Sequence, residues 1–69
     1  MSRLIDVIAV FNTVKDVKPL YYTLDGNKYK IDKVVSKIDF HNIITFHCMV
    51  GGELTTLIFD VEKKQWTVD

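Results

Sequence analysis

His41, His47 and Cys48 are the side chains of this sequence that could bind a soft metal ion or form a nucleophile–base pair. A structural zinc site needs about four ligands that converge on the ion at ~2.0–2.3 Å. His47 and Cys48 are neighbours, so on a strand their side chains point to opposite faces, and the chain has no second cysteine. We therefore predict no metal site and no cofactor.

Catalysis by Cys48 with a histidine as base meets a further difficulty. A catalytic thiol needs an exposed, electropositive position, whereas Cys48 lies within the alternating apolar run Ile43–Val50. Asp32 lies within a predicted strand beside Lys30 and Lys33, which favours a cross-strand ion pair over a general acid–base role. We predict that the protein is not an enzyme.

The lysines are distributed unevenly along the chain. Between Thr13 and Lys37, six lysines against three aspartates give a balance of +3, and the remaining charges bring the net charge to zero. A sheet face that carries lysines and an aromatic ring can contact the phosphates and stack the bases of single-stranded nucleic acid. It can equally be a solvated face that keeps an edge strand from aggregating. The candidate binding residues are Tyr21, Lys28, Lys30 and Lys33.

The stretch Pro19–Val35, which must position these residues, predicts a β-hairpin. Two runs rich in aromatic and β-branched residues flank the Asp-Gly-Asn sequence at 25–27. Tight hairpin turns prefer these residue types because they tolerate positive φ. The apolar alternation then changes phase, with odd-numbered Ile31 followed by even-numbered Val34 and Ile38. Such a slip is typical of a β-bulge or a strong bend.

The first predicted strand, Arg3–Phe11, is apolar on both faces. In a domain of two layers, the second face of such a strand is covered by barrel closure or by another subunit. We therefore predict a homo-oligomer that forms through the strand Leu4–Phe11. An open sheet edge could also accept a partner's peptide as an added strand.

The rest of the chain continues the alternation. A loop is expected over Asn12–Lys18 and a turn over Asp39–Asn42, and strands are expected over Ile43–Val50, Glu53–Val61 and Trp66–Val68. Short strands that recur every ~8–12 residues are typical of all-β domains. The expected fold is all-β, a small antiparallel meander of five or six strands that forms a half-open barrel or an orthogonal sandwich. The predicted core comprises Tyr22, Leu24, Tyr29, Ile31, Ile44, Phe46, Cys48, Val50, Leu57, Phe59 and Trp66.

The length and composition limit the class of protein. A chain of 69 residues makes one small domain, over residues 1–69, with a thin core. Because its net charge is zero, the chain lacks the overall positive charge that commonly attracts proteins to nucleic acid or anionic membranes. Secreted domains of this size usually carry several cysteines, so a single cysteine predicts a cytoplasmic protein. No signal peptide and no apolar run of ~18 residues is found, so we expect no membrane span.

The run Pro19–Val35 also carries a resemblance. With the Gly-x-x-Tyr-x-Ile-Asp-Lys-Val segment at 26–34 and the Leu-Ile-Phe-Asp stretch at 57–60 before Trp66, the chain resembles a group of short uncharacterised bacterial proteins from clostridia and their relatives. The resemblance covers most of the chain and implies an all-β domain from a low-GC Gram-positive bacterium. It implies no activity and no site.

Together these features predict a non-enzymatic interaction module for protein–protein binding or homo-oligomerisation. The alternative is a single-stranded nucleic-acid platform on the lysine and tyrosine face of the hairpin.

Overall fold

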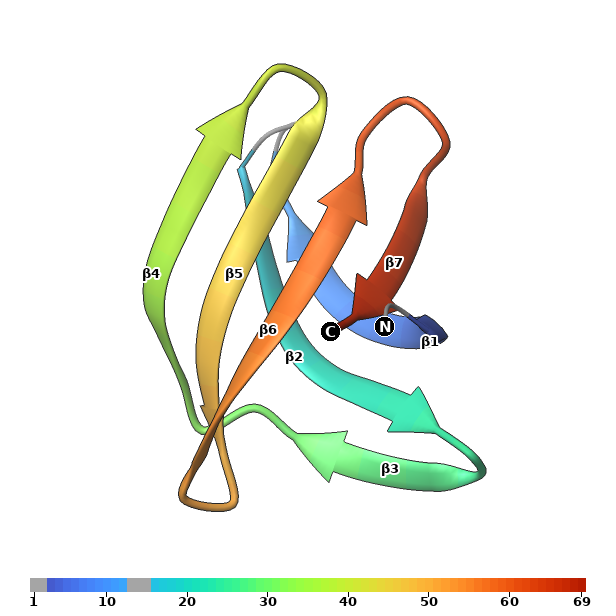
Figure 1. Ribbon diagram of the computed structural model, residues 1–69, viewed down its shortest axis with the longest axis vertical. Helices are drawn as coiled ribbons and strands as arrows, with labels where there is room; N and C mark the ends of the chain where they lie inside the picture. The colour runs from blue at the N-terminus through green and yellow to red at the C-terminus, as the bar shows by residue number, and fades with distance from the viewer. Residues whose placement is uncertain (1–2, 13–15) are drawn as a thin grey trace.

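The computed structural model describes residues 3–12 and 16–69, and its secondary structure consists of antiparallel strands (Figure 1). The all-β prediction is confirmed. The expected number of five or six strands is too low, because the described residues form seven. The strands are β1 (Arg3–Phe11), β2 (Val17–Leu24), β3 (Asn27–Lys30), β4 (Lys33–Phe40), β5 (Ile43–Val50), β6 (Glu53–Asp60) and β7 (Gln65–Val68).

The strands form one curled sheet in the order β3-β2-β1-β7-β6-β5-β4, a half-barrel. Its two outermost strands, β3 and β4, are consecutive in the chain and are joined by Ile31 and Asp32. The Ile31 amide donates to the Leu20 carbonyl at 2.9 Å, and the Asp32 amide donates to the Met49 carbonyl at 2.9 Å. These two bonds tie the ends of the sheet together at one point. The bend predicted after Ile31 is confirmed. It divides one long run of residues into the two strands β3 and β4, which brings the number of strands to seven.

The β2–β3 hairpin turns where the sequence predicts it. Asp25 and Gly26 both have positive φ, 53° and 80°, the conformation that a two-residue primed turn requires. Gly51 and Gly52 repeat the pattern between β5 and β6, with φ of 58° and 83°. Both turns let neighbouring strands pair without a change of register.

The core lies on the concave face of the sheet. In β5, Ile44, Phe46 and Cys48 are buried at 0–1% exposure, while the residues between them point outward as the alternation predicts. The Trp66 ring packs on Phe46 and Phe59, with centroids 5.5 and 4.6 Å away. Eight predicted core residues are buried, namely Tyr22, Ile31, Ile44, Phe46, Cys48, Leu57, Phe59 and Trp66. The other three, Leu24, Tyr29 and Val50, are partly buried against this core, which also includes Ile5, Val17 and Val68.

Strand β2 begins earlier than the sequence predicts. The expected loop over Asn12–Lys18 lies partly outside the described residues, at 13–15, but Val17 and Lys18 belong to β2. Val17 pairs with Phe11 of β1 and is 4% exposed. The prediction was wrong because this stretch is mostly polar, and nothing in its local composition indicates that tertiary packing buries Val17.

Strand β4 differs from the prediction in its end and in its face. Asp39 and Phe40, expected in a turn, pair with residues of β5 and extend β4 to the two-residue turn at 41–42. A bulge between Val34 and Ser36 shifts the register, so Val34 packs against the core whereas Ile38 points outward and is 52% exposed. The expectation that Val34 and Ile38 share one face was wrong, because a bulge inserts one residue and reverses the alternation.

Candidate interaction surfaces

The outer face of β1 carries three exposed aliphatic side chains, Leu4, Ile8 and Val10, which we call the β1 row, and the exposed Asp6 lies on the same face between Leu4 and Ile8. The exposed fractions of the three aliphatic side chains are 68%, 53% and 45%. Ile5 and Ala9, on the opposite face of the strand, belong to or pack against the core. The sequence predicted a strand that is apolar on both faces, and the fold of this chain covers only one of them.

The lysine face lies beside the β1 row, on the outer side of the β2–β3 hairpin. Tyr21 pairs with Ile8 of β1 on one side and with Lys30 of β3 on the other. The Lys28 ammonium nitrogen lies 4.6 Å from the centroid of the Tyr21 ring. The structure therefore brings together three of the four predicted binding residues.

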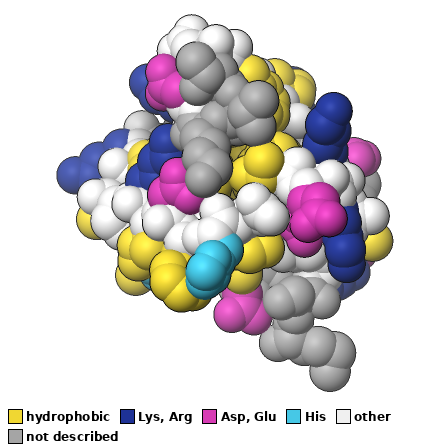
Figure 2. All heavy atoms as spheres, turned by 90° about the horizontal axis from the view of Figure 1, so that it is seen from above, with side chains coloured by type: hydrophobic (Ala, Val, Ile, Leu, Met, Phe, Trp, Pro, Cys, Tyr) yellow, Lys and Arg dark blue, Asp and Glu magenta, His cyan; other side chains and the backbone are white. Residues whose placement is uncertain are grey.

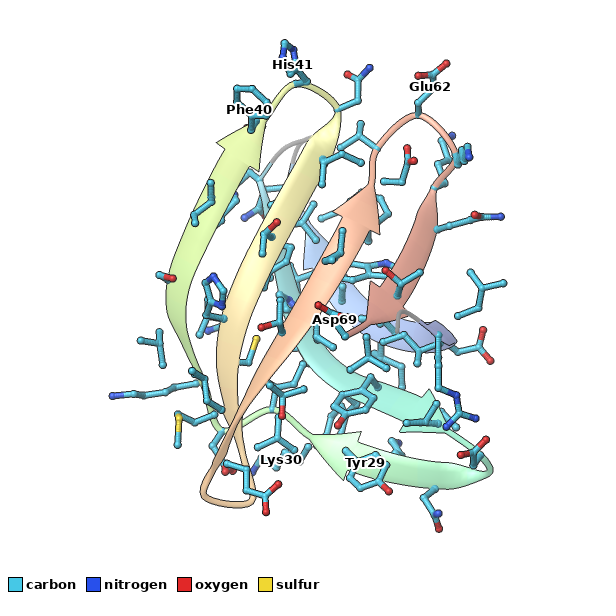
Figure 3. The ribbon with its side chains drawn as sticks, viewed as in Figure 1. Tyr29, Lys30, Phe40, His41, Glu62 and Asp69 are labelled. Carbon is cyan, nitrogen blue, oxygen red and sulfur yellow. The ribbon has the colours of Figure 1, made fainter. Side chains whose placement is uncertain are left out.

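Lys33, the fourth predicted residue, belongs to a different part of the sheet. It begins β4 beyond the bend at 31–32 and pairs with Met49 of β5. Tyr29 and Lys30 mark the β3 end of the molecule, away from the β4–β5 turn that carries His41 (Figure 3). A nucleic-acid surface on the hairpin would therefore consist of Tyr21, Lys28 and Lys30, with Lys33 beside the bend.

Asp32 does not form the cross-strand ion pair that the sequence suggested. Its carboxylate accepts a hydrogen bond from the Gly51 amide at 3.0 Å, so it connects the bend to the β5–β6 turn. Here the residue is used for local backbone hydrogen bonding, a common role of aspartate at turns.

His47 and Cys48 point to opposite faces, as strand geometry requires. Cys48 is fully buried, and this burial raises the pKa of its thiol above the ordinary value. The His47 Nδ1 lies 3.2 Å from the Thr56 hydroxyl oxygen on the outer face, and the His41 ring contacts Phe40 with centroids 4.1 Å apart. Within residues 3–12 and 16–69, no three His, Cys, Asp or Glu side chains form a group that could hold a metal ion.

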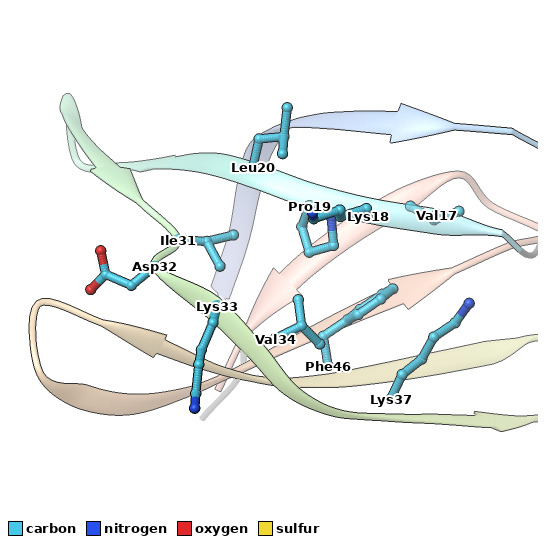
Figure 4. A pocket seen from close by; sticks show the side chains of 10 residues that line it. All are labelled: Val17, Lys18, Pro19, Leu20, Ile31, Asp32, Lys33, Val34, Lys37 and Phe46. Atoms are coloured by element: carbon cyan, nitrogen blue, oxygen red, sulfur yellow. The ribbon is translucent and has the colours of Figure 1, made fainter.

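A groove lies between the first half of β2 and the first half of β4. We call it the β2–β4 groove; its volume is about 440 Å³. It exists because β2 pairs with β3 only from Tyr21 onward, so the earlier part of β2 faces β4 without a sheet ladder between them. Its lining comprises Val17, Lys18, Pro19, Leu20, Ile31, Asp32, Lys33, Val34, Lys37 and Phe46 (Figure 4). Sequence reasoning missed this groove, because no local pattern pairs β2 with β4.

A second exposed apolar group lies at the β4–β5 end, where Ile38, Phe40 and Ile43 are 52%, 68% and 37% exposed. Figure 3 places Phe40 and His41 together at this end, and Figure 2 shows hydrophobic side chains beside a histidine there. The sequence did not predict this group, since Phe40 was assigned to a turn and no exposed apolar cluster was expected at this end.

The chain matches no protein-family model, no curated protein and no solved structure among those compared with it. The resemblance to short clostridial proteins therefore stays a prediction. Within the part of the chain that the structure describes, no helix has the length and apolar character needed to cross a membrane.

Proposed function

We propose that this protein is a small, non-enzymatic interaction module of the bacterial cytoplasm that associates with a second copy of itself through the β1 row. The observation that carries the proposal is the exposure of three aliphatic side chains on one face of a strand in the interior of the sheet order, a face on which Asp6 is the one charged residue of β1. Removing such surface from water is favourable by roughly 25 cal/mol per Å².

Two further properties support a second copy as the partner. The net charge of zero means that two copies do not repel each other through their overall charge. A chain of 69 residues also buries a smaller fraction of its surface on folding than a larger domain does, so association adds stability that its own core lacks. Two-fold association of one patch with itself is the commonest arrangement in homo-oligomers.

Replacing Ile8 with glutamate should convert the oligomer to monomer, because the new carboxylate would have to lose its hydration inside the interface. Ile8 is the suitable position because it is 53% exposed and central in the β1 row, so the folded monomer tolerates the change. Mass by multi-angle light scattering is the measurement. Ala9 is unsuitable for this test, since it packs against the core.

Ser36→Glu is the matched control, because it also places a carboxylate at an exposed strand position but lies on β4. It should leave the mass of the wild-type oligomer unchanged. A wild-type protein that is monomeric at all concentrations, or an Ile8→Glu variant with the wild-type mass, would contradict the proposal.

The second candidate function is binding of single-stranded nucleic acid on the lysine face. The position of Lys28 over the Tyr21 ring, with Lys30 paired opposite Tyr21, favours it. The same contact also weakens it, because the ammonium group occupies a ring face on which a base would stack. We therefore rank this function below self-association.

An amide NMR titration with short single-stranded oligonucleotides tests the second function. If it is correct, shifts cluster at 20–33, and binding weakens as salt rises, because each neutralised phosphate contributes about −0.7 to the slope of log K against log salt. The double variant Lys28→Gln/Lys30→Gln should make that slope shallower by about 1–1.5. Lys63→Gln/Lys64→Gln, in the turn before β7, is the charge-matched control. A titration without shifts at low salt would exclude this function.

A further inference from the structure

We propose that two copies of the chain pack with their β1 strands antiparallel across a two-fold axis near Ile8, so that Asp6 of each copy forms an ion pair with Lys18 of the other. This inference rests on the proposed self-association through the β1 row and adds the arrangement of the two copies. Asp6 calls for such an arrangement, because it lies exposed between Leu4 and Ile8 on the face that association would cover.

The Asp6 carboxylate has no cation beside it within one copy. Its neighbour across the β1–β2 ladder is Thr23, and among residues 3–12 and 16–69 it forms no ion pair and no side-chain hydrogen bond. A charged carboxylate that loses its hydration inside an interface is costly unless a cation pairs with it. Association through this face is therefore favoured when the second copy supplies the cation.

Lys18 lies on the same face, at the opposite end of the β1 row. It pairs with Val10 across the β1–β2 ladder, and paired residues of an antiparallel ladder point to the same side of the sheet. It is exposed and alternates with the buried Val17 and Pro19, as an outward side chain does. Like Asp6, it forms no ion pair in the described part of the chain. Asp6 and Val10 are about 13 Å apart along β1, so Asp6 and Lys18 cannot pair within one copy.

The charges distinguish two ways in which this face can meet itself by two-fold symmetry. An axis along β1 places each residue opposite the same residue of the second copy, so the two Asp6 carboxylates would face each other, and like charges in contact across an interface are strongly unfavourable. An axis across β1 near Ile8 reverses the strand, and Asp6 then lies opposite Val10 of the second copy. Lys18, on the adjacent strand about 4.8 Å away, comes within reach of the carboxylate. The symmetry makes two such ion pairs.

Other cations near this face are poorer partners for Asp6. Arg3 already pairs with Asp25, and the Lys28 ammonium group lies over the Tyr21 ring. The lysines of β3 are also farther from β1, because β2 lies between the two strands. Lys18 is therefore the cation that the antiparallel arrangement brings to Asp6.

Exchange of the two charges between copies tests this arrangement. Asp6→Lys alone and Lys18→Asp alone should each weaken dimerisation about 100-fold, because each creates two like-charge contacts that cost about tenfold apiece. An equal mixture of the two variants should restore the mass of the wild-type dimer, because one copy then carries both lysines and the other both aspartates. Light scattering gives the mass, and native mass spectrometry identifies the heterodimer.

Lys33→Asp is the matched control, because Lys33 is also an exposed strand lysine but lies on β4, at the end of the sheet order. This variant should dimerise as the wild type does, and it should not restore a dimer when mixed with Asp6→Lys. The amide spectrum of each variant alone checks its fold. Should a variant of the first pair not fold, Asp6→Arg and Lys18→Glu repeat the test.

The possible failures separate this arrangement from self-association as such. A wild-type protein that is monomeric at all concentrations would contradict self-association and, with it, the arrangement. A wild-type dimer whose mass is unchanged by Asp6→Lys and by Lys18→Asp would overturn the arrangement and leave self-association standing. A mixture of the two variants that stays monomeric would also overturn it, since the charges across the proposed interface are then complementary.

Discussion

Replacement of Phe46 with alanine is expected to lower the free energy of unfolding by about 3–5 kcal/mol. Phe46 is 1% exposed at the centre of β5, between Lys37 of β4 and Leu57 of β6, and its ring stacks on Trp66. Alanine would leave a cavity beside the Trp66 ring and at the β2–β4 groove, which Phe46 lines. A small domain has a total stability of about 5 kcal/mol at the low end, so the loss is enough to unfold much of the population.

Urea denaturation followed by Trp66 emission measures this effect, and Phe40→Ala is the matched control. Phe40 is also a phenylalanine on a neighbouring strand, but it is 68% exposed, so its truncation should change the free energy of unfolding by ~0.5 kcal/mol or less. Equal losses for the two variants, or a loss below about 1 kcal/mol for Phe46→Ala, would mean that β5 does not face the core as described.

Cys48 should react with a thiol reagent at least ~10³-fold more slowly in the native protein than in the unfolded chain. Its side chain is 0% exposed, so the reagent reaches it only when the sheet opens. Burial also raises the pKa of the thiol, and the protein therefore holds less of the reactive thiolate than free cysteine does at the same pH.

Labelling with a disulfide reagent, in buffer and in denaturant, gives this ratio. The Phe46→Ala variant should label roughly 100-fold faster than the wild type in buffer, because a loss of ~3 kcal/mol raises the open population by that factor. A labelling rate of the native protein within tenfold of that of the unfolded chain would instead mean that Cys48 is accessible. A role for Cys48 as a reactive thiol would then have to be tested.

The parts of the fold that the sequence predicts are those governed by local chemistry. The Asp-Gly turn at 25–26 needs positive φ at both positions, and that requirement is visible in the residues themselves. The alternation in Ile43–Val50 is also local, because a strand places successive side chains on opposite faces. The bulge at Val35, which turns Ile38 outward, has no such local signature.

The candidate sites also differ in whether local sequence patterns predict them. Tyr21, Lys28 and Lys30 lie on one hairpin, so their common face follows from the turn and the alternation. The β2–β4 groove depends on how far the sheet curls, and its Lys18 and Lys37 come from strands that do not pair. No spacing along the chain predicts that β2 and β4 face each other across a groove.

The pairing of β1 with β7 has a consequence for how the chain folds. Among the described strands, every other neighbouring pair in the sheet is a hairpin between consecutive strands. Arg3 meets Val68 across the remaining pair, so this contact closes nearly the whole chain into a loop. The chain must lose the conformational entropy of closing that loop before the contact contributes any stabilisation. We therefore expect the slow step of folding to be the docking of the β1–β3 meander on the β4–β7 meander, with the β1–β7 pair as their shared ladder.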